Sequence, residues 1–582
     1  MTAPDLIIRN GTIVDGNGGD PYCADIAIVG ASIAAIGAVR GTGAAELDAT
    51  GLLVTPGFVD VHTHYDGQVT WSDTLAPSSG HGVTTVVVGN CGVGFAPCRV
   101  QDRASLINVM QGVEDIPEAV MAEGLPWNWE TFPDYLNALA ARRWDADVAA
   151  YLPHSPLRVY VMGQRGLDRE AATRADIEQM TALVAQAMSA GAMGFSTSRT
   201  LVHRRGDGEF IPSFQAASDE LTAIAGAVGH SGHGVVQMIP NLDSQDHESD
   251  MQLLMRIARA CGRPVTYSLA QWLRDTTGWK KTLDALGRCN AADGTRLVAQ
   301  VFPRPMAVIG GLDTSANPFS LCPSYLPLVA LPLAERVAAL RDPGLKARLL
   351  REQPADPRNP MYLLMRDFAN VYPMAAEPNY EPDRGSSIAA MAQQRGIEAS
   401  ELAYELLLQD QGHTLLFVPF ANFWEHNLDA AMAMMCDPNS VIGLGDGGAH
   451  YGLICDASYP TTVLTHWTRD RHGRRLSLPW AVKALAADTA DLMGLRDRGR
   501  LAVGLKADLN LIDQARLRLF APRVAADLPG GKKRLVQEAA GYCATIVSGI
   551  VTRREGRPTG ALPGRLVRGR SALAQRVQQA TA

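Results

Sequence analysis

The chain has 582 residues, of which 47% are hydrophobic and 19% charged, and its formal net charge is −7. This composition supplies a large apolar core, and the negative charge argues against nucleic acid as a partner. No run of about 18 apolar residues occurs and the first residues lack a basic, apolar leader, so we expect a cytoplasmic protein without a membrane partner. Nine cysteines without a Cys-x-x-Cys pair are typical of reduced, buried thiols.

Residues 1–55 contain short strand patterns separated by turn dipeptides. The run 6–9 is followed by Asn10-Gly11, which predicts a β-hairpin. Similar strand patterns return near the other end of the chain, at 508–512 and 544–551. We therefore predict that residues 1–55 and 491–582, the latter including a tail, form one small discontinuous β-sandwich.

Residues 56–490 alternate between β-strand and α-helix patterns, which indicates parallel strands. Two helices are well marked, because 176–190 ends at Gly191 and 249–261 ends at Gly262. The alternation predicts an α/β fold, a (β/α)8 TIM-like barrel whose chemistry lies at the carboxyl ends of the strands. The eight predicted strands are 58–61, 83–88, 148–152, 192–195, 235–238, 264–267, 297–302 and 441–444.

Two connections within the predicted barrel are much longer than the others. They are the insertions at 97–147 and 303–440. Insertions of this length commonly build lids or subunit contacts over the active face. We expect a homo-oligomer on this basis, although insertions of this kind also cap their own barrel in many proteins.

The first predicted strand leads into a candidate metal site. The apolar run 58–61 is followed by His62 and His64, which are two residues apart and therefore point to the same face. Asp66 follows closely. Two imidazoles with a nearby carboxylate are typical ligands of a divalent ion such as zinc.

The ends of the second and eighth strands carry further candidate ligands. Cys91 follows the second strand, and it is either a thiolate that binds one ion or bridges two, or a buried neutral thiol. Asp446 follows the eighth strand, which neighbours the first in a barrel. A carboxylate there can bind the ion, take a proton from water and pass it to the leaving amine; a turn-forming Asp before Gly is the alternative. His450 either lies behind the metal ligands, contacts substrate, or is simply a loop histidine.

Longer motifs extend this pattern. They are the segments 56–64, 82–92, 154–158, 191–196, 445–447 and 497–509, with Gly541-Tyr542 and Thr559-Gly560. With these motifs the chain resembles the amidohydrolase superfamily, in its N-acyl-D-amino-acid deacylase branch, over nearly its whole length. The resemblance implies a metal-bearing (β/α)8 barrel, a β-sandwich made from both termini, and hydrolysis of a C–N amide bond. It also implies that the outer metal is held by His62, His64 and Asp446, with Cys91 as a bridging or shared ligand.

The chain departs from this branch at the fifth and sixth strands. Members of the branch carry a histidine at the end of each, which completes a second metal site. Ile239 and Leu269 stand at these positions, and neither can bind a metal. His230 and His233 precede the fifth strand and would lie on the wrong face. We therefore expect one ion per chain, zinc or another divalent metal. Its ligands are His62, His64 and Asp446, with or without Cys91.

The substrate needs anchoring groups around this ion. The basic residue that follows the sixth-strand histidine in the branch is replaced by Gln271. Arg199, after the fourth strand, is a candidate for binding a substrate carboxylate through two hydrogen bonds. The equally good alternative is that Arg199 belongs to a solvent-exposed basic loop. The candidate substrate-binding residues are Arg199, His203, Arg304, His154, Arg158, Gln271 and His450.

These features predict a metal-dependent hydrolase that cleaves the C–N amide bond of a small molecule, an N-acyl amino acid or a similar amide, with Asp446 as proton shuttle. One alternative is a hydrolase that opens a cyclic amide, imide or ureide. Another is a barrel that has lost catalysis and acts as a binding or scaffold subunit. The joint presence of His62, His64 and Asp446 argues against the scaffold, because it has no need for them.

Overall fold

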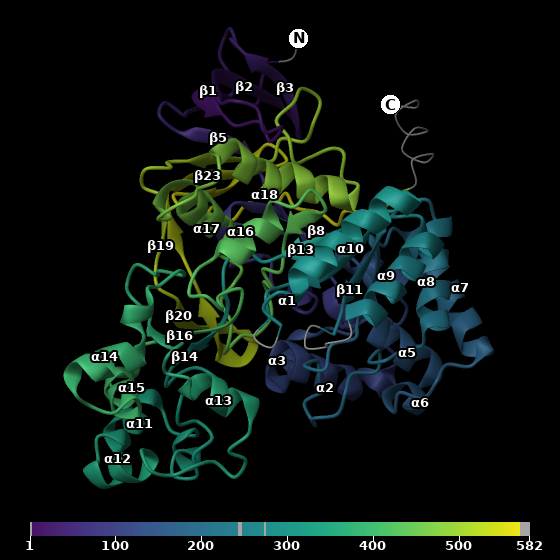
Figure 1. Ribbon diagram of the computed structural model, residues 1–582. Helices are drawn as coiled ribbons and strands as arrows, with labels where there is room; N and C mark the ends of the chain where they lie inside the picture. Colours follow the sequence, from purple (N-terminus) through teal and green to yellow (C-terminus); the bar gives the residue numbers. More distant parts are fainter. Residues whose placement is uncertain (1–2, 242–246, 273–274, 571–582) are drawn as a thin grey trace.

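The computed structural model describes residues 3–241, 247–272 and 275–570 (Figure 1). Strands from both ends of the chain share one nine-stranded sheet, in the order β25-β24-β23-β18-β5-β1-β2-β3 with β4 beside β1. The two ends meet where β18 pairs antiparallel with β5. These strands are β1 (Leu6–Ile13), β2 (Tyr22–Val29), β3 (Ser32–Gly37), β4 (Ala45–Asp48), β5 (Leu53–Pro56), β18 (Leu509–Ile512), β23 (Tyr542–Val547), β24 (Ile550–Arg554) and β25 (Arg557–Pro558).

The hairpin predicted at Asn10-Gly11 is wrong, because β1 runs through this dipeptide. Asn10 has a φ of 59°, and the pairing of β1 with β2 shifts between Ile8 and Gly11. The dipeptide therefore forms a β-bulge, in which one extra residue is accommodated in left-handed backbone without ending the strand. The same strand pairs with β2 before and after the bulge.

A strand occurs at each of the eight positions predicted for the middle of the chain, and their pairing is parallel. The strands β6-β7-β8 form one set and β9-β10-β11-β12-β13-β17 another. Only Tyr151 separates β8 from β9, and its N–H donates to the carbonyl of Val88 at 2.9 Å. The strands are β6 (Phe58–Asp60), β7 (Val83–Val88), β8 (Asp147–Ala150), β9 (Leu152–Pro153), β10 (Gly194–Ser198), β11 (Val235–Ile239), β12 (Val265–Leu269), β13 (Leu297–Val301) and β17 (Ser440–Ile442).

Helices alternate with these strands, and several lie together at the right of Figure 1. The start of α7 is fixed by a capping box between Thr173 and Asp176, and its end by Gly191 at a φ of 103°. The helices of this part are α1 (Gln68–Trp71), α5 (His154–Met162), α6 (Gln164–Leu167), α7 (Arg174–Ala190), α8 (Ser218–His230), α9 (His247–Cys261), α10 (Gly278–Asp293), α16 (Asp429–Met435), α17 (Tyr459–Thr465) and α18 (Leu478–Met493).

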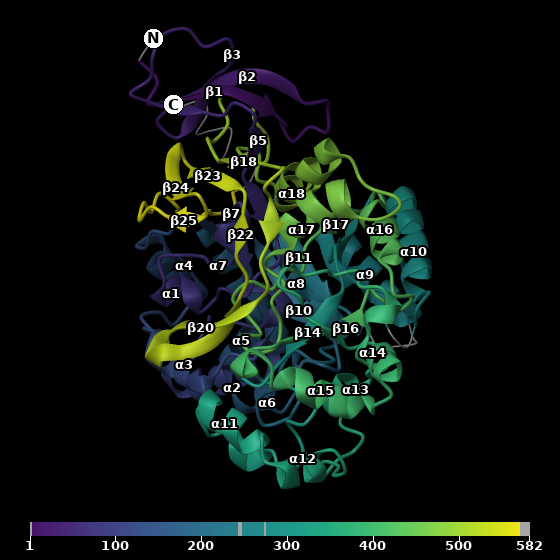
Figure 2. The same ribbon diagram turned by 90° about the vertical axis from the view of Figure 1, so that its left-hand side faces the viewer.

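The two predicted insertions contain their own secondary structure, and most of their helices lie at the opposite end of the molecule from the terminal strands β1–β3 (Figures 1 and 2). The second insertion has a separate apolar core that includes Phe319, Leu402 and Tyr404. The first contains α2 (Arg103–Glu114), α3 (Glu118–Gly124) and α4 (Phe132–Ala140). The second contains β14 (Met306–Gly310), α11 (Leu333–Leu340), α12 (Pro343–Leu349), α13 (Pro360–Arg366), β15 (Tyr372–Pro373), α14 (Ile388–Arg395), α15 (Ala399–Leu407) and β16 (Leu416–Ala421).

The C-terminal part of the chain also reaches the insertions. A hairpin of two strands extends along the molecule to α3 in Figure 2, and the N–H of Leu535 donates to the carbonyl of Tyr451 at 2.7 Å. The residues after β17 are therefore covered by a segment from near the end of the chain. The strands of this part are β19 (Arg518–Leu519), β20 (Arg523–Leu528), β21 (Lys532–Val536) and β22 (Ala539–Ala540).

A buried ion network joins the end of the chain to the parallel strands. Asp147, the first residue of β8, accepts from Arg498 Nη1 at 2.6 Å and from Lys506 Nζ at 2.7 Å. Lys506 also pairs with Asp508 at 2.8 Å.

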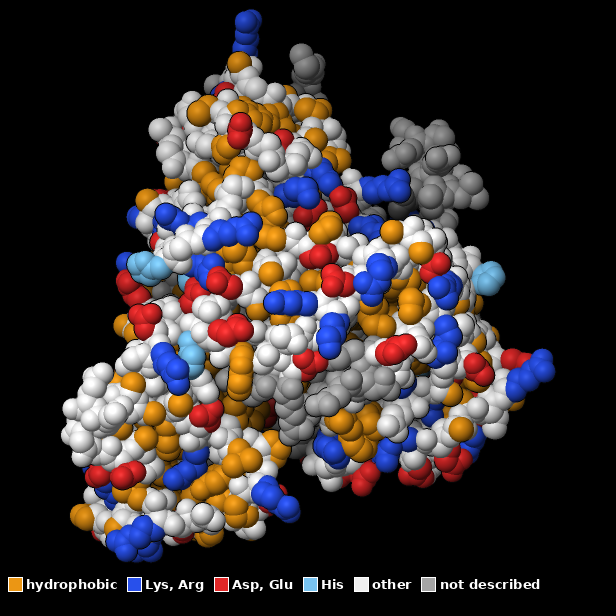
Figure 3. Space-filling model, viewed as in Figure 1, with side chains coloured by type: hydrophobic (Ala, Val, Ile, Leu, Met, Phe, Trp, Pro, Cys, Tyr) orange, Lys and Arg blue, Asp and Glu red, His pale blue; other side chains and the backbone are white. Residues whose placement is uncertain are grey.

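Acidic and basic side chains are interspersed on the face of the molecule shown in Figure 3. Among the described residues, no helix combines the length and apolar character that crossing a bilayer requires.

Candidate metal centre

Two buried histidines follow the first parallel strand, β6. The N–H of His62 donates to Asp60 Oδ1 at 3.2 Å, and that of His64 donates to the carbonyl of Gly447 at 2.8 Å. Thr63 also forms an isolated parallel β-bridge with Gly447, so the residues after β6 and β17 lie side by side. Both imidazoles are 1% exposed. Burial lowers the pKa of each, which favours the neutral imidazole that binds metals.

Cys91 lies in the turn that follows β7. Its Sγ is 3.3 Å from His62 Nε2 and 3.5 Å from His64 Nε2. Its N–H donates to Gln237 Oε1 at 3.0 Å, which ties the turn to β11. The backbone of Cys91 is left-handed, with a φ of 57°. Such a conformation costs of order 1–3 kcal/mol in a non-glycine residue and is commonly retained at functional sites.

Asp446 approaches the same two nitrogens from the residues after β17. Its Oδ1 lies 3.4 Å from His62 Nε2 and 3.7 Å from His64 Nε2. Its N–H donates to the carbonyl of His62 at 3.2 Å, and its φ is 46°. The Asp446 side chain is 16% exposed, whereas the two imidazoles are almost fully buried. Its carboxylate is therefore the most accessible of the candidate ligands.

Each histidine has a hydrogen-bonding group beside its other ring nitrogen. His62 Nδ1 lies 2.6 Å from Gln300 Oε1 on β13. His64 Nδ1 lies 3.3 Å from Glu114 Oε1, at the end of α2. The Gln300 oxygen favours a proton on His62 Nδ1, which leaves the Nε2 lone pair of His62 directed toward Cys91 and Asp446. The contact between His64 and Glu114 is an ion-pair approach without a hydrogen bond.

The spacing of these atoms fits a divalent metal. The donor atoms of His62, His64 and Cys91 all lie within 4.8 Å of one another. Neighbouring donors around a tetrahedral zinc stand about 3.3 Å apart for N and O and about 3.6 Å apart for N and S. The four distances from the imidazoles to Cys91 and Asp446 are 3.3, 3.5, 3.4 and 3.7 Å. Two neutral imidazoles, a thiol and a carboxylate are also the donors that zinc prefers.

The electrostatics of the cluster favour a cation as well. Burial raises the pKa of the Cys91 thiol well above its usual value, and Glu114, Asp446 and Asp66 raise it further. Burial also raises the pKa of Glu114, with contributions from Asp446 and Asp66. Burial raises the pKa of Asp66 to about 7. A bound cation would favour the deprotonated thiol and carboxylates, because it offsets both their burial and their mutual repulsion.

Two of the predicted substrate-binding residues lie near this cluster. The imidazoles of His203 and His450 interact electrostatically with His64, and burial together with His450 and His62 lowers the pKa of His203 to about 3. His203 Nδ1 lies 2.9 Å from Ser198 Oγ at the end of β10. His450 Nε2 lies 3.6 Å from Glu114 Oε2. The structure therefore places both histidines beside the candidate metal ligands.

The other predicted substrate-binding residues make contacts within the protein. Glu220 accepts from both His154 and Arg158, and all three are buried. Arg304, also buried, pairs with Asp456 at 2.7 Å. Two further residues behave in the same way. The Nη1 of Arg199 donates to the carbonyl of Ala216 at 3.0 Å, and the side-chain Nε2 of Gln271 donates to Glu425 Oε2 at 3.3 Å.

The structure corrects the predicted register of the sixth strand by one residue. Ser268 is paired with Gln300, whose side chain reaches His62, so Ser268 shares the side of the strands that faces the cluster. Leu269, the next residue along the strand, points to the opposite side because side chains alternate along a strand. Ile239 does end β11, as predicted. Neither Ile239 nor Ser268 supplies an imidazole.

The remaining histidines near the fifth strand lie away from the cluster. His230 is exposed at the end of α8, and His233 follows in the turn before β11. Three polar residues that do contact the cluster were missed in the sequence. Gln237 and Gln300 stand in otherwise apolar strands, which was an available signal, whereas Glu114 lies in an insertion and no local pattern marks it.

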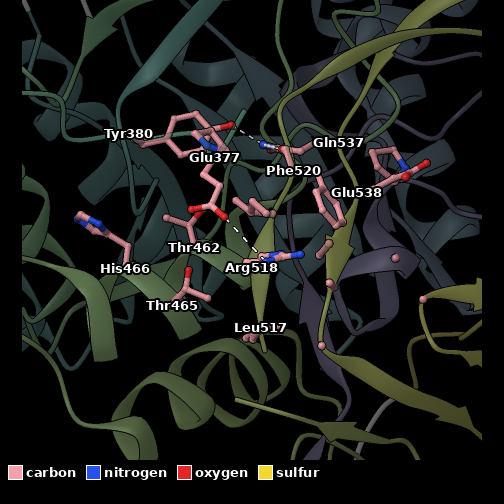
Figure 4. Close-up of a pocket in the computed structure, with 18 of the residues that line it drawn as sticks. Glu377, Tyr380, Thr462, Thr465, His466, Leu517, Arg518, Phe520, Gln537 and Glu538 are labelled. Atoms are coloured by element: carbon pink, nitrogen blue, oxygen red, sulfur yellow. Dashed lines mark hydrogen bonds and ion pairs between the residues drawn. The ribbon is translucent and has the colours of Figure 1, made fainter. Parts of the chain in front are cut away.

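A cavity of about 1450 Å³ is a separate feature of the structure (Figure 4). It is lined by residues of the second insertion, α17 and the C-terminal strands, and by none of the candidate metal ligands. Many of its charged side chains are paired with each other, as are Arg471 and Glu381 at 2.8 Å and Arg534 and Asp527 at 2.8 Å. Because it contains none of the candidate metal ligands, this cavity is not the candidate catalytic site despite its size.

Fold and site together define an α/β protein with a metal-type donor cluster at the carboxyl ends of parallel strands. The sequence profile of the Amidohydrolase family matches residues 45–553, and the chain belongs to this family. This match confirms the prediction, made from the sequence motifs, that the chain is an amidohydrolase.

Three relatives illustrate the similarity. An uncharacterized protein of Mycobacterium tuberculosis is 28% identical over 95% of this chain and 92% of its own. D-aminoacylase of Alcaligenes xylosoxydans xylosoxydans is 33% identical over 45% of this chain and 50% of its own. A solved D-aminoacylase, described as having a binuclear metal centre with one-metal activation and second-metal attenuation, has a TM-score of 0.65. It is 24% identical and matches 97% of this chain and 100% of its own.

Proposed function

We propose that this protein is a metal-dependent hydrolase that cleaves the C–N amide bond of an N-acyl amino acid or a similar small amide. The observation that carries the proposal is the approach of Cys91 Sγ and Asp446 Oδ1 to the Nε2 atoms of His62 and His64, at 3.3–3.7 Å. Family membership and the D-aminoacylase relative support the same reaction class.

The proposed chemistry divides the work among the residues of the cluster. His62, His64, Cys91 and Asp446 would hold the ion, which when bound supplies a Lewis acid that lowers the pKa of water to about 7. Asp446 takes the proton of the attacking water and later gives it to the leaving nitrogen. Its partial exposure, 16% of the side chain, fits this second role, because the carboxylate must meet the substrate.

We assign one zinc ion, or another single divalent ion, to each chain. Ile239 ends the fifth strand, Ser268 and Leu269 end the sixth, and none of them contributes a metal-binding nitrogen. The related D-aminoacylase is described as activated by one metal, so a single ion is compatible with this chemistry. His203 and His450 are the side chains that we assign to substrate contact.

The domain arrangement belongs to the same proposal. Residues 56–490 form the closed (β/α)8 barrel, and residues 1–55 and 491–582 form the β-sandwich with its tail. The hydrogen bonds from Asp446 and His64 to residues across the β6 and β17 ends support closure of the barrel. A homo-oligomer remains a prediction, and light scattering of the purified protein tests it.

The decisive experiment compares N-acyl amino acids with cyclic imides and ureides, with and without a metal chelator. We expect turnover in the N-acyl panel, loss of turnover with the chelator, and recovery when zinc is added back. Turnover confined to the cyclic panel would identify the ring-opening reaction instead. Absence of chelator-sensitive turnover in both panels would refute the proposal and favour a binding or scaffold protein.

A further inference from the structure

Helix α2 ends on a buried carboxylate beside the metal cluster. Glu114 is the last residue of this helix, and its side chain is only 2% exposed. The charged groups that act on it most strongly are Asp446 and Asp66, which are both acidic. A buried carboxylate is costly unless something compensates its charge. The buried carboxylate of Glu114 therefore requires a partner that offsets its charge.

The two carboxylate oxygens face two different imidazoles. Glu114 Oε1 lies 3.3 Å from His64 Nδ1, and Oε2 lies 3.6 Å from His450 Nε2. Within the described part of the chain, neither His64 Nδ1 nor Glu114 Oε1 makes a hydrogen bond, and their 3.3 Å approach is an ion-pair contact. The Glu114 carboxylate is the ion-pair partner of His64 Nδ1. The other nitrogen, His64 Nε2, lies beside Cys91 and Asp446.

The backbone around Glu114 is fixed from two other parts of the chain. The carbonyl of Glu114 accepts the N–H of His450. The next residue, Asp115, accepts from the N–H of Gly452 at 3.1 Å and from Ser315 Oγ at 3.2 Å. The end of α2 is thus attached both to the residues after β17 and to the second insertion. This attachment holds the carboxylate against His64.

The two histidines of the cluster therefore have unlike supports. His62 is held by the neutral amide of Gln300, at 2.6 Å. His64 faces a carboxylate at 3.3 Å. A carboxylate partner orients a metal-binding imidazole, fixes its tautomer and raises its basicity, whereas an amide supplies orientation without charge. The difference predicts that the two supports contribute unequally to metal affinity.

We propose that Glu114, supplied by the first insertion, is a positioning residue of the metal centre that accepts the Nδ1 proton of His64 and thereby strengthens ion binding at Nε2. The inference rests on the metal site of the proposed function. It makes α2 part of the metal centre, in addition to any role that the insertion has as a cover. Glu114 itself does not touch the reacting atoms in this assignment.

The test compares Glu114→Gln with the matched control Glu118→Gln in the full-length protein. Glu118 is an exposed residue at the start of the neighbouring helix α3. The dissociation constant of zinc is measured by competition with a chelator, and the thermal midpoint is measured for the metal-free protein. Substitution of partners in the outer shell of metal sites typically costs about 10- to 100-fold in affinity. We expect a loss of this size for Glu114→Gln, partial rescue by Glu114→Asp, and no change for the control.

Two further measurements separate positioning from a general structural role. The metal-free Glu114→Gln protein should be at least as stable as wild type, because burial and the neighbouring Asp446 and Asp66 disfavour a carboxylate at this position. Cobalt-loaded protein should keep its near-ultraviolet cobalt–thiolate band, because Cys91 is untouched. An unchanged zinc dissociation constant, or a loss of affinity accompanied by a lower metal-free midpoint, would refute the role of Glu114. Failure of the wild-type protein to bind any divalent ion would instead refute the proposed function.

Discussion

Gln300 Oε1 lies 2.6 Å from His62 Nδ1, across 238 positions of sequence. Gln300 is fully buried on β13, and its Nε2 has no hydrogen-bond partner within the described residues. A buried amide in an apolar strand is costly unless its hydrogen bonds are used. Here its oxygen fixes the orientation of one of the two histidines on which the candidate metal centre depends.

The first prediction concerns this contact. Gln300→Leu keeps the side-chain volume roughly constant and removes the acceptor, so His62 loses its preferred orientation. We expect zinc affinity to fall by about 10- to 100-fold. Gln300→Glu, which retains an acceptor, should bind zinc at least as tightly as wild type. Equal affinities for the Leu variant and wild type would show that the His62–Gln300 contact has no part in metal binding.

The second prediction concerns metal content. Purified protein should carry about one tightly bound divalent ion per chain, because three or four ligands are needed for each zinc. His62→Ala should remove that ion, and Cys91→Ser should lower its affinity. Metal analysis of protein dialysed against a metal-free buffer provides the measurement. Two tightly bound ions per chain, with His203 or His450 as a ligand, would contradict the prediction and restore a binuclear mechanism.

The third prediction separates the two roles of Asp446. Asp446→Asn retains an oxygen that can face the ion but cannot accept and return a proton. Turnover should fall by about 10²- to 10⁴-fold, which is the usual contribution of a general acid–base group. The zinc content should remain close to that of wild type. If turnover falls only in proportion to lost metal, Asp446 is a ligand alone.

The fourth prediction concerns the buried trio of His154, Arg158 and Glu220. Burial alone would raise the pKa of Glu220, but its hydrogen bonds with His154 and Arg158 outweigh burial and lower the pKa to about 2. Glu220→Gln leaves Arg158 buried without its carboxylate, and we expect a loss of about 3–5 kcal/mol in stability at neutral pH. Urea unfolding measures this loss. Glu178→Gln, at an exposed pair with Arg174, is the control and should change stability by less than about 0.5 kcal/mol.

The pH dependence of this effect has a defined sign. A lowered carboxyl pKa stabilises the folded state fully above the unfolded value, about 4.3 for Glu. This stabilisation is lost as the pH falls from about 4.3 toward the folded value of about 2. The stability difference between wild type and Glu220→Gln should therefore shrink over that range. A difference that stays constant down to pH 2 would show that Glu220 is not charged in the folded protein.

The fifth prediction concerns the ion network at Asp147. Asp147→Asn preserves shape but deprives Arg498 and Lys506 of a buried charged partner. We expect a loss of about 3–5 kcal/mol, with earlier proteolytic cleavage in residues 491–570. Thermal unfolding and limited proteolysis provide the measurements. Asp73→Asn, at an exposed pair with Arg142, should leave both unchanged.

The sequence by itself determined the strand positions and the principal candidate ligands. A strand lies at each of the eight positions where short apolar runs predicted one, because burial of such runs is a local property. His62, His64, Cys91 and Asp446 were identified by their positions directly after strands, since the carboxyl ends of parallel strands meet at one edge. The sequence did not determine which side of a strand each residue faces, because a shift of one residue reverses that side. Leu269 was therefore assigned to a position on the cluster side that Ser268 occupies.

Only the tertiary structure showed which polar side chains lie beside the candidate site. Arg199, Arg304, His154, Arg158 and Gln271 had the right chemistry, yet each makes contacts within the protein. Gln300 and Glu114 had no motif, yet each lies beside a candidate metal-binding histidine. Such pairings join residues far apart in the chain, and local periodicity carries no information about them. They depend on the register of strands and on how the insertions attach, which are set by packing of the whole molecule.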